Sequence, residues 1–331
     1  MGLRIGVLGT GRLGREHVRV LCGLDEVEFV GCRDRVAERA ESAAADFGAT
    51  SYGSAEGLIE DVDAVSVVVP TSDHAKYALA ALEAGKDVFV EKPLAGELAD
   101  AVSIVERARQ GKRVVQVGHS ERFNGVLENV RSRIQNPAFI EIHRLAPFSV
   151  RGTDVSVVGD LMIHDLDLLF YLLGEAPVEV RAKGAGVLTE APDIVNARLE
   201  YASGCVANVT ASRVSVEPMR KLRLFSKNRY ISIDMRRGQA VEYRKSAGFE
   251  EHIARLRRHA DGYDKFQLGD FIEFESFGSD DVEPLEKELR AFCRSVATRE
   301  PPPVTGEDGL NAVRLAVEIF EIVQRDIAAQ R

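Results

Sequence analysis

The stretch Gly9-Thr10-Gly11-Arg12-Leu13-Gly14 decides how the chain begins to fold. It stands directly behind an apolar run at residues 3–8, and Asp34 follows twenty residues after its end, behind a second apolar run at residues 27–32. Strand, glycine turn, helix and acid at this spacing form the fingerprint of a dinucleotide-binding βαβ unit. The glycines permit a tight turn and a close backbone approach to a pyrophosphate, to which the helix N-terminus presents N–H groups. The predicted cofactor site therefore includes Gly9, Gly11, Arg12, Leu13, Gly14 and Asp34.

The acid at position 34 also bears on the choice of cofactor. A carboxylate there accepts hydrogen bonds from an adenosine ribose and repels a 2′-phosphate, so the sequence favours NAD over NADP. Arg33 and Arg35 flank Asp34 and could turn toward a 2′-phosphate. NADP therefore remains the second choice.

Length and composition are those of a globular protein with about two domains. The 331 residues are 45% hydrophobic and 29% charged, and domains commonly hold ~150 residues. The four cysteines show no CxxC spacing, so we expect reduced thiols and no zinc site. The net charge of -9 argues against a nucleic-acid partner. Because no leader is evident and no run approaches the ~20 apolar residues of a membrane span, we expect a cytoplasmic protein without membrane contact.

Strand and helix patterns alternate up to about residue 120, which predicts a doubly wound parallel sheet. Beyond it, apolar runs joined by short links indicate a mostly antiparallel sheet. The predicted fold class is therefore α/β, with an N-terminal Rossmann domain and a C-terminal α+β domain whose sheet is open. We expect the NAD-binding Rossmann domain at 1–120 and a substrate and oligomerisation domain at 121–283. Helices at 284–331 are expected to pack back on the Rossmann domain.

Polar residues follow two neighbouring strands of the predicted parallel sheet. Ligands of such sheets bind beyond the carboxyl ends of the strands. Pro70, Thr71 and His74 follow one strand, and Glu91 and Lys92 follow the next, so all five join the predicted cofactor site. An ammonium group fixed beside a cofactor is a good proton donor or hydroxyl clamp, which makes Lys92 a catalytic candidate. The alternative for Lys92 is an ordinary solvated lysine in a turn.

A polar stripe crosses an otherwise apolar predicted helix at residues 160–173. Asp160, His164, Asp167 and Tyr171 are spaced by four, three and four residues, which places them on one helical face. Unpaired burial of such groups costs ~1–3 kcal/mol each, so the stripe requires hydrogen-bond partners or a ligand. The alternative to a ligand site is a satisfied pair of His164 with a neighbouring aspartate. A single histidine without ligand spacing argues against a metal.

Five motifs along the chain carry a resemblance to a known family. They are the glycine turn, residues 71–74, residues 81–94 with Glu91-Lys92-Pro93, the Asp160-x-x-x-His164 pair and residues 306–309. Together they resemble the glucose-fructose oxidoreductase, inositol dehydrogenase and MocA (Gfo/Idh/MocA) family. The resemblance spans nearly the whole chain and implies hydride transfer between a nicotinamide and a sugar or polyol carbon. It also implies a homodimer or homotetramer built through the C-terminal sheet, and catalytic roles for Lys92, Asp160 and His164.

A narrower resemblance concerns residues 118–124, 143–148 and 151–167. These are similar to the bacterial UDP-N-acetylglucosamine 3-dehydrogenases that precede an aminotransferase in making the diamino sugar of lipid A. Gly125 and Gly159 depart from the usual pattern of that group. The resemblance implies a nucleotide-sugar substrate, and guanidinium groups hold diphosphate oxygens bidentately. The predicted substrate contacts are Arg122, Phe123, Asn124, Arg151, Asp160 and His164.

The expected reaction is removal of a sugar hydroxyl proton while hydride leaves the same carbon. An imidazole suits proton acceptance near neutrality, so His164 is the predicted base. Asp160 would orient the substrate, and Lys92 would stabilise charge on the reacting oxygen; exchanged roles for Lys92 and His164 remain open. Three other functions stay in view: a dehydrogenase of a free polyol or monosaccharide such as inositol, an NAD-dependent glycosidase, and a non-catalytic NAD-binding regulator.

Overall fold

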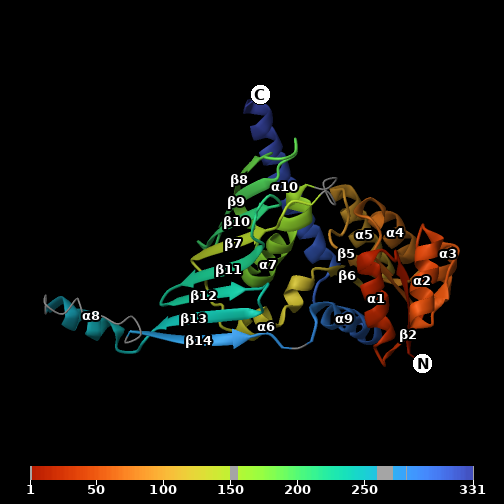
Figure 1. The fold of residues 1–331 in the computed structure, drawn as a ribbon, viewed down its shortest axis with the longest axis horizontal. Coiled ribbons are helices and arrows are strands. Elements are labelled where there is room, and N and C mark those ends of the chain that lie inside the picture. Colours follow the sequence, from red (N-terminus) through yellow and green to blue (C-terminus); the bar gives the residue numbers. More distant parts are fainter. Residues whose placement is uncertain (1, 150–155, 259–270, 281, 331) are drawn as a thin grey trace. The chain divides into compact units, whose positions relative to one another are not determined.

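The computed structural model describes residues 2–149, 156–258, 271–280 and 282–330, which form two compact units (Figure 1). Each unit is assembled from separate stretches of the chain. Unit 1 consists of Met1–Phe123, Val158–Phe170 and Val282–Glu321, and unit 2 of Asn124–Val157, Tyr171–Asp281 and Ile322–Arg331. The predicted α/β class, with one parallel and one mostly antiparallel sheet, is confirmed.

Unit 1 holds, within its described residues, a six-stranded parallel sheet in the order β3-β2-β1-β4-β5-β6. Its strands are β1 (Leu3–Leu8), β2 (Val27–Arg33), β3 (Thr50–Ser51), β4 (Ala64–Val67), β5 (Asp87–Glu91) and β6 (Val115–Gly118). The order reverses between β1 and β4, and two mononucleotide-binding halves meet there. Ligands of doubly wound sheets bind at this reversal, outside the carboxyl ends of the strands.

The helices of unit 1 build its apolar core against this sheet. Its complete helices are α1 (Arg12–Cys22), α2 (Ala37–Phe47), α3 (Ala55–Asp61), η1 (Thr71–Asp73), α4 (His74–Glu83), α5 (Leu98–Gly111), η2 (Ser120–Phe123), the π-helical turn η3 (Val158–Met162) and α9 (Pro284–Thr298). Two more, α7 (Ile163–Leu173) and α10 (Gly306–Gln330), begin in unit 1 and end in unit 2. Residues of α1, α2 and α9 share one buried cluster with β1 and with Phe89 of β5. That cluster fixes α1 against the strand that precedes the glycine turn.

Unit 2 is built on an eight-stranded sheet in the order β14-β13-β12-β11-β7-β10-β9-β8. Its strands are β7 (Phe139–Leu145), β8 (Pro177–Ala185), β9 (Ile194–Tyr201), β10 (Val206–Ser212), β11 (Met219–Ser226), β12 (Arg229–Asp234), β13 (Gln239–Lys245) and β14 (Ile272–Gly278). The pairing of β7 with β10 is parallel, and the other six pairs are antiparallel. Alternate residues such as Ile140 and Ile142 are buried while their neighbours are not, so one face of the sheet is packed and the other more open. The helices α6 (Gly125–Arg131) and α8 (Phe249–Arg258) also belong to this unit.

Two strands of unit 2, β13 and β14, were not predicted from the sequence. The alternation of β13 is obscured because Glu242 occupies a buried position, with its side chain 0% exposed. Arg133 and Arg229 contact its carboxylate at 2.9 and 2.8 Å, and Arg244 lies 3.8 Å from it. An acid paired in this way can stand where a hydrophobic residue is expected.

The described residues contain neither a disulfide nor a helix that could span a membrane. None of the four cysteines forms a disulfide. In the part of the chain that the structure describes, every helix is too short or too polar to cross a membrane.

Replacement of Phe292 by alanine tests the shared core of unit 1. Phe292 on α9 is fully buried and meets Phe89 edge to face, with ring centroids 5.8 Å apart. Removing such a ring leaves a cavity, and we expect Phe292→Ala to lower the free energy of unfolding by about 3–5 kcal/mol in urea denaturation followed by circular dichroism. The control Val216→Ala, at a side chain 94% exposed, should leave the transition unchanged. Equal midpoints for the two variants would contradict this account of the core.

Candidate active site

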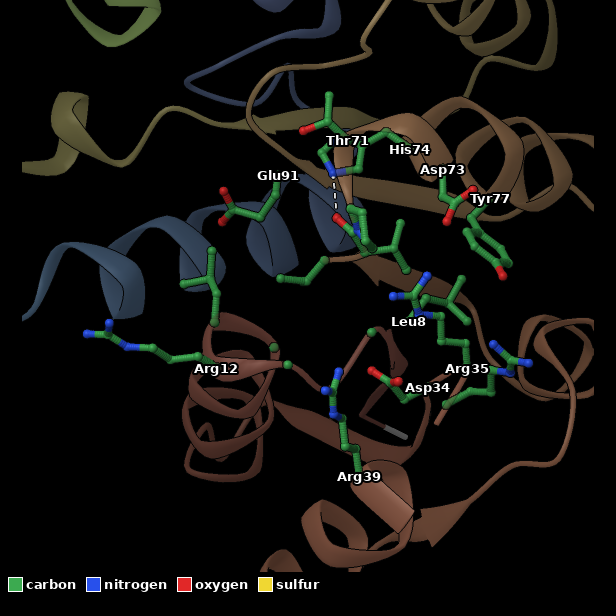
Figure 2. A pocket seen from close by; sticks show the side chains of 18 of the residues that line it. Leu8, Arg12, Asp34, Arg35, Arg39, Thr71, Asp73, His74, Tyr77 and Glu91 are labelled. Carbon is green, nitrogen blue, oxygen red and sulfur yellow. Dashed lines mark hydrogen bonds between the residues drawn. The ribbon is translucent and has the colours of Figure 1, made fainter. Parts of the chain in front are cut away.

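A pocket of about 350 Å³ lies in unit 1 at the carboxyl ends of β1, β2, β4 and β5 (Figure 2). Its lining comes from segments far apart in the sequence, which the reversed strand order brings together. It includes every residue that the sequence assigned to the cofactor: Gly9, Gly11, Arg12, Leu13, Gly14, Asp34, Pro70, Thr71, His74, Glu91 and Lys92.

The three glycines of the turn differ in the space that a side chain would find there. Gly9 has a φ of +94°, and a Cβ there would lie 2.5 Å from the Val68 carbonyl oxygen. A Cβ on Gly14 would lie 1.9 Å from the Gly9 carbonyl oxygen. A Cβ on Gly11 would meet no atom within 4 Å, and α1 begins behind Gly11 without a side-chain cap. The turn and the helix N-terminus therefore form an open cradle that fits a pyrophosphate.

Asp34 ties the end of β2 to the glycine turn. Its Oδ2 accepts the Thr10 N–H at 2.7 Å, and its Oδ1 accepts the Val36 N–H at 2.9 Å. A carboxylate offers about four acceptor positions, so both oxygens can still accept a ribose hydroxyl. Besides Arg12 and Lys92, three further basic side chains line this pocket: Arg33, Arg35 and Arg39. The geometry therefore leaves the preference for NAD over NADP a prediction.

The Lys92 ammonium contacts Asp160, which lies in η3. Its Nζ donates to the Asp160 carbonyl oxygen at 2.7 Å and to Oδ1 at 3.1 Å. The Lys92 side chain is 19% exposed and that of Asp160 41%. Two residues predicted to be catalytic are thus joined, and their charges offset one another in a half-buried place.

His74 holds the loops after β4 and β5 together. Its ring nitrogens lie 2.7 Å from the Pro93 carbonyl oxygen and 2.9 Å from that of Val69. Burial lowers the pKa of His74, although both carbonyls favour its charged form. The ring therefore fixes the backbone next to Lys92.

His164, the predicted base, lies near a second histidine of unit 1. Its ring meets that of His119 edge to face, with centroids 6.3 Å apart. His119 is 1% exposed, and its Nδ1 lies 4.0 Å from Asp167 Oδ2. Burial lowers the pKa of His119, so its ring is neutral around pH 7. The His164 ring is thus placed against an uncharged neighbour.

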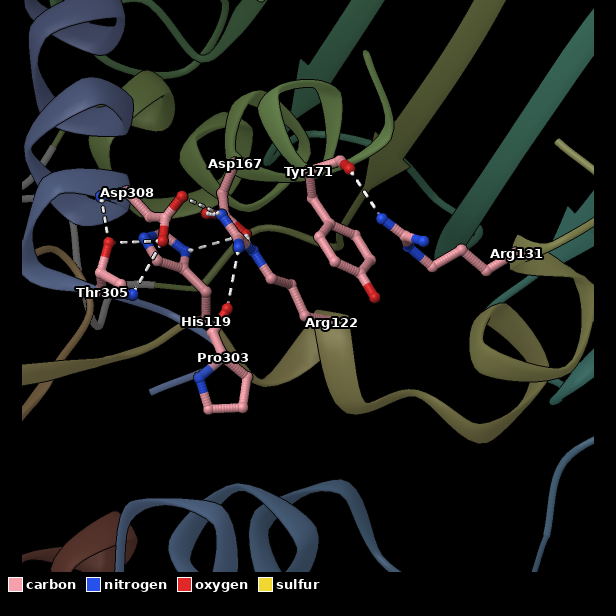
Figure 3. Close-up of polar contacts among 8 residues, drawn as sticks. All are labelled: His119, Arg122, Arg131, Asp167, Tyr171, Pro303, Thr305 and Asp308. Carbon is pink, nitrogen blue, oxygen red and sulfur yellow. Dashed lines mark hydrogen bonds and ion pairs between the residues drawn. The ribbon is translucent and has the colours of Figure 1, made fainter. Parts of the chain in front are cut away.

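Arg122 is held by acids inside unit 1 (Figure 3). Its Nε and Nη2 donate to Asp167 at 2.8 and 2.6 Å, Nη2 lies 3.2 Å from Asp308 Oδ1, and Nη1 donates to the Pro303 carbonyl at 3.1 Å. Thr305 in turn donates to Asp308 from both its N–H and its hydroxyl. These contacts occupy a guanidinium that is only 6% exposed, so the geometry lends no support to a substrate contact by Arg122.

The remaining substrate-contact predictions divide by location. Phe123 is 6% exposed at the end of η2. Asn124, in unit 2, is 9% exposed; its Oδ1 accepts the Val126 N–H and its Nδ2 donates to the Met235 carbonyl. Both side chains are buried in the fold, and their contact with substrate stays a prediction. Arg151 lies outside the described residues.

The polar stripe predicted on one helical face is divided among four partners. Asp160 falls in the π-helical turn η3 and contacts Lys92, whereas His164 faces His119 and Asp167 pairs with Arg122. Tyr171, in unit 2, contacts Arg131, whose guanidinium lies 4.2 Å from the centre of the tyrosine ring (Figure 3). The stripe therefore does not form one ligand-facing row, and catalytic roles for Asp160 and His164 stay a prediction.

Sequence reasoning missed several residues of this region. Arg39 and Tyr77 line the pocket from α2 and α4. Both lie in the first turn of a helix that follows a strand of the parallel sheet, and this position could have predicted them. His17 is 0% exposed and contacts Glu91; its position one turn beyond Gly14 was the available signal. The described residues contain no group of three or more His, Cys, Asp or Glu side chains suited to a metal ion.

Substitutions at Gly11 and Gly14 test the cradle. Gly11→Ala fills open space in the pocket, so we expect dinucleotide binding to weaken at least about tenfold while the melting temperature is unchanged. Gly14→Ala forces a clash with the Gly9 carbonyl and should lower both the dinucleotide affinity and the melting temperature. Gly53→Ala, also with nothing within 4 Å but outside the pocket, is the matched control. Titration calorimetry and thermal unfolding measure the two effects, and undiminished binding by Gly11→Ala would contradict the assignment.

Comparison with protein-family models matches both parts of the chain. Residues 3–119 match the model described as oxidoreductase family, NAD-binding Rossmann fold. Residues 123–233 match the GFO/IDH/MocA C-terminal domain. Together these matches cover more than half of the chain.

Individual relatives span nearly the whole chain. A UDP-N-acetylglucosamine 3-dehydrogenase from Acidithiobacillus ferrooxidans is 34% identical over 325 residues, covering 96% of this chain and 98% of the relative. A crystal structure of the enzyme of that name from the same organism superposes with a TM-score of 0.87 at 31% identity, covering 98% of this chain and 99% of the other. A myo-inositol 2-dehydrogenase from Thermotoga maritima is 28% identical, with 95% and 94% covered. By sequence and fold, this chain belongs to the Gfo/Idh/MocA family of NAD-binding oxidoreductases.

Proposed function

We propose that this protein oxidises the 3-hydroxyl of UDP-N-acetylglucosamine to a ketone with NAD as acceptor. The single observation that carries a catalytic reading is the contact of Lys92 Nζ with Asp160 at the cofactor pocket. The sugar nucleotide is taken from the relative in Acidithiobacillus ferrooxidans. The inositol dehydrogenases among the relatives support a free polyol as the second candidate.

The cofactor would lie across the reversal of strand order. The cradle at Gly9–Gly14 suits the pyrophosphate, and Asp34 suits the adenosine ribose. Bound NAD supplies the acceptor for the hydride that leaves the sugar carbon. Arg35 and Arg39 leave NADP as the less favoured alternative.

Residues of unit 1 would accept the proton of the 3-hydroxyl and stabilise the charge that develops on its oxygen. His164 accepts the proton of the 3-hydroxyl as the C–H bond breaks, and Lys92 donates a hydrogen bond to the same oxygen, where negative charge develops. Asp160 orients Lys92 through the contact already described. In the alternative assignment Lys92 takes the proton and His164 positions the hydroxyl. Either way the sugar loses a hydride and a proton and becomes a 3-keto sugar nucleotide, which suits a later transamination of the kind used for lipid A.

We also propose that the open face of the unit 2 sheet joins copies of the chain into a homodimer or homotetramer. Aromatic rings form a continuous row on this sheet. Phe225 stacks on Tyr230 with centroids 4.7 Å apart, and Tyr230 on Tyr243 with centroids 5.5 Å apart. Next to Tyr243 in register lies Phe274, 71% exposed. An exposed aromatic row of this kind is typical of a protein interface.

Variants at Lys92 and His164 test the catalytic proposal. We expect Lys92→Ala and His164→Ala to lower kcat for UDP-N-acetylglucosamine about 10²- to 10⁴-fold, because each removes a proton acceptor or a charge stabiliser. NADH absorbance reports the rate, and NAD binding should persist. The exposed Lys227→Ala is the control. Undiminished rates in both variants would end the catalytic assignment.

The same assay separates the other functions. Comparable efficiency on free inositol would replace the nucleotide-sugar proposal by a polyol dehydrogenase. Release of product without net NADH would indicate a glycosidase. Tight NADH binding with no turnover of any sugar would favour a regulator.

A charge placed in the aromatic row tests the oligomer. Tyr243→Glu buries a carboxylate between copies if the row is an interface, so we expect a smaller species in light scattering after gel filtration. Val216→Glu, at an exposed position outside the row, should keep the wild-type mass. An unchanged mass for Tyr243→Glu would argue against this face.

A further inference from the structure

The carboxylate of Glu91 occupies a closely fitted slot at the end of β5. Glu91 lines the cofactor pocket yet is only 8% exposed. Its Oε2 accepts the Lys92 N–H at 3.1 Å. A Cβ on Gly118 would lie 2.8 Å from Oε2 and 2.9 Å from Cδ. The carboxylate therefore has its place only because residue 118 has no side chain.

A buried histidine and serine hold the other side of this carboxylate. His17 Nε2 lies 3.1 Å from Glu91 Oε1, and His17 Nδ1 lies 2.9 Å from the Ser66 hydroxyl. A neutral imidazole satisfies both contacts, because Nε2–H donates to the carboxylate and Nδ1 accepts from the hydroxyl. The ring also packs edge to face on Phe89, with centroids 5.4 Å apart. Glu91 is therefore fixed from three sides.

Serine, histidine and acid in this order suggest a hydrolytic triad, but burial excludes that role. Ser66 and His17 are both 0% exposed, so no substrate reaches the serine hydroxyl. The pocket touches only the Glu91 end of the series. What this arrangement offers to a ligand is a positioned carboxylate, not a nucleophile.

The fixed carboxylate of Glu91 is charged at neutral pH. Burial alone would raise its pKa, but the His17 hydrogen bond and the nearby Lys92 bring the pKa below its ordinary value. Glu288, fully buried nearby, differs: burial and the charge of Glu91 raise its pKa well above the usual range, so Glu288 stays neutral. Lys92 is itself paired with Asp160. Glu91 thus presents a fixed negative charge at this end of the pocket.

We infer that Glu91 biases the protein toward the oxidised form of its cofactor. Because Asp34 marks the adenosine half, the nicotinamide half falls on the side of β4 and β5, where Glu91 ends its strand. The oxidised nicotinamide is cationic and the reduced ring is neutral. A fixed carboxylate beside the ring therefore strengthens NAD⁺ binding relative to NADH. This inference rests on the proposed function and deepens it, since it sets the redox preference of the same site.

The test compares three ligands in purified wild-type protein and in Glu91→Gln. NADH binding is followed by its fluorescence, and NAD⁺ and ADP-ribose by titration calorimetry. The amide keeps the shape of Glu91 and loses its charge, so we expect the ratio Kd(NADH)/Kd(NAD⁺) to fall roughly tenfold, as for two charges several Å apart in a partly screened site. ADP-ribose, which lacks the ring, should bind unchanged. Glu91→Asp keeps the charge and should keep most of the ratio.

Asp34→Asn is the matched control, because it removes a carboxylate from the other end of the same pocket. We expect it to weaken all three ligands by a similar factor and to leave the ratio as in wild type. If Glu91→Gln does not fold, Glu91→Met removes the same charge and should also lower the ratio. A wild-type ratio in whichever of these two variants folds overturns the inference. Failure of wild type to bind any of the three ligands would instead overturn the cofactor assignment.

Discussion

The close approach of Gly14 to the carbonyl of Gly9 is the constraint on which the site depends. A single methyl group would stand 1.9 Å from that oxygen, so α1 can start beside β1 only with glycine at this place. One turn further, the same helix carries His17 to Glu91 at the end of β5. The packing that opens the phosphate cradle therefore also sets a charge on the far side of the pocket.

Unit 1 keeps its buried charges by giving each a partner of opposite sign or a hydrogen-bonding network. Arg122 is clamped by Asp167 and Asp308, and Lys92 by Asp160. An ion removed from water is tolerated only with such compensation. The exception is Glu288, which remains uncharged. These pairs join stretches that are distant in the sequence: the end of β5 with η3, and η2 with α7 and α10.

Local patterns predicted much of this molecule and could not predict the rest. The alternation of strands and helices predicted the parallel sheet, and the glycine turn with Asp34 predicted its own part of the pocket lining, because strand, turn and acid are close in sequence. The pairing of Arg122 with Asp167 spans 45 residues, and no periodicity indicates which cation a buried acid will meet. The π-helical turn at Asp160 likewise broke the expected helical face. Buried Glu242 interrupts the apolar alternation of β13, so the sequence pattern did not indicate this strand.

The hydrogen bond from the Thr10 N–H to Asp34 couples cofactor choice to the shape of the glycine turn. The carboxylate suited to the adenosine ribose is also the acceptor that shapes the loop under the diphosphate. Engineering the protein to use NADP therefore demands more than a cation for the extra phosphate. A new residue at position 34 must also accept the hydrogen bond from the Thr10 N–H. Without that hydrogen bond the loop loses its conformation, and the affinities for NAD and NADP both fall.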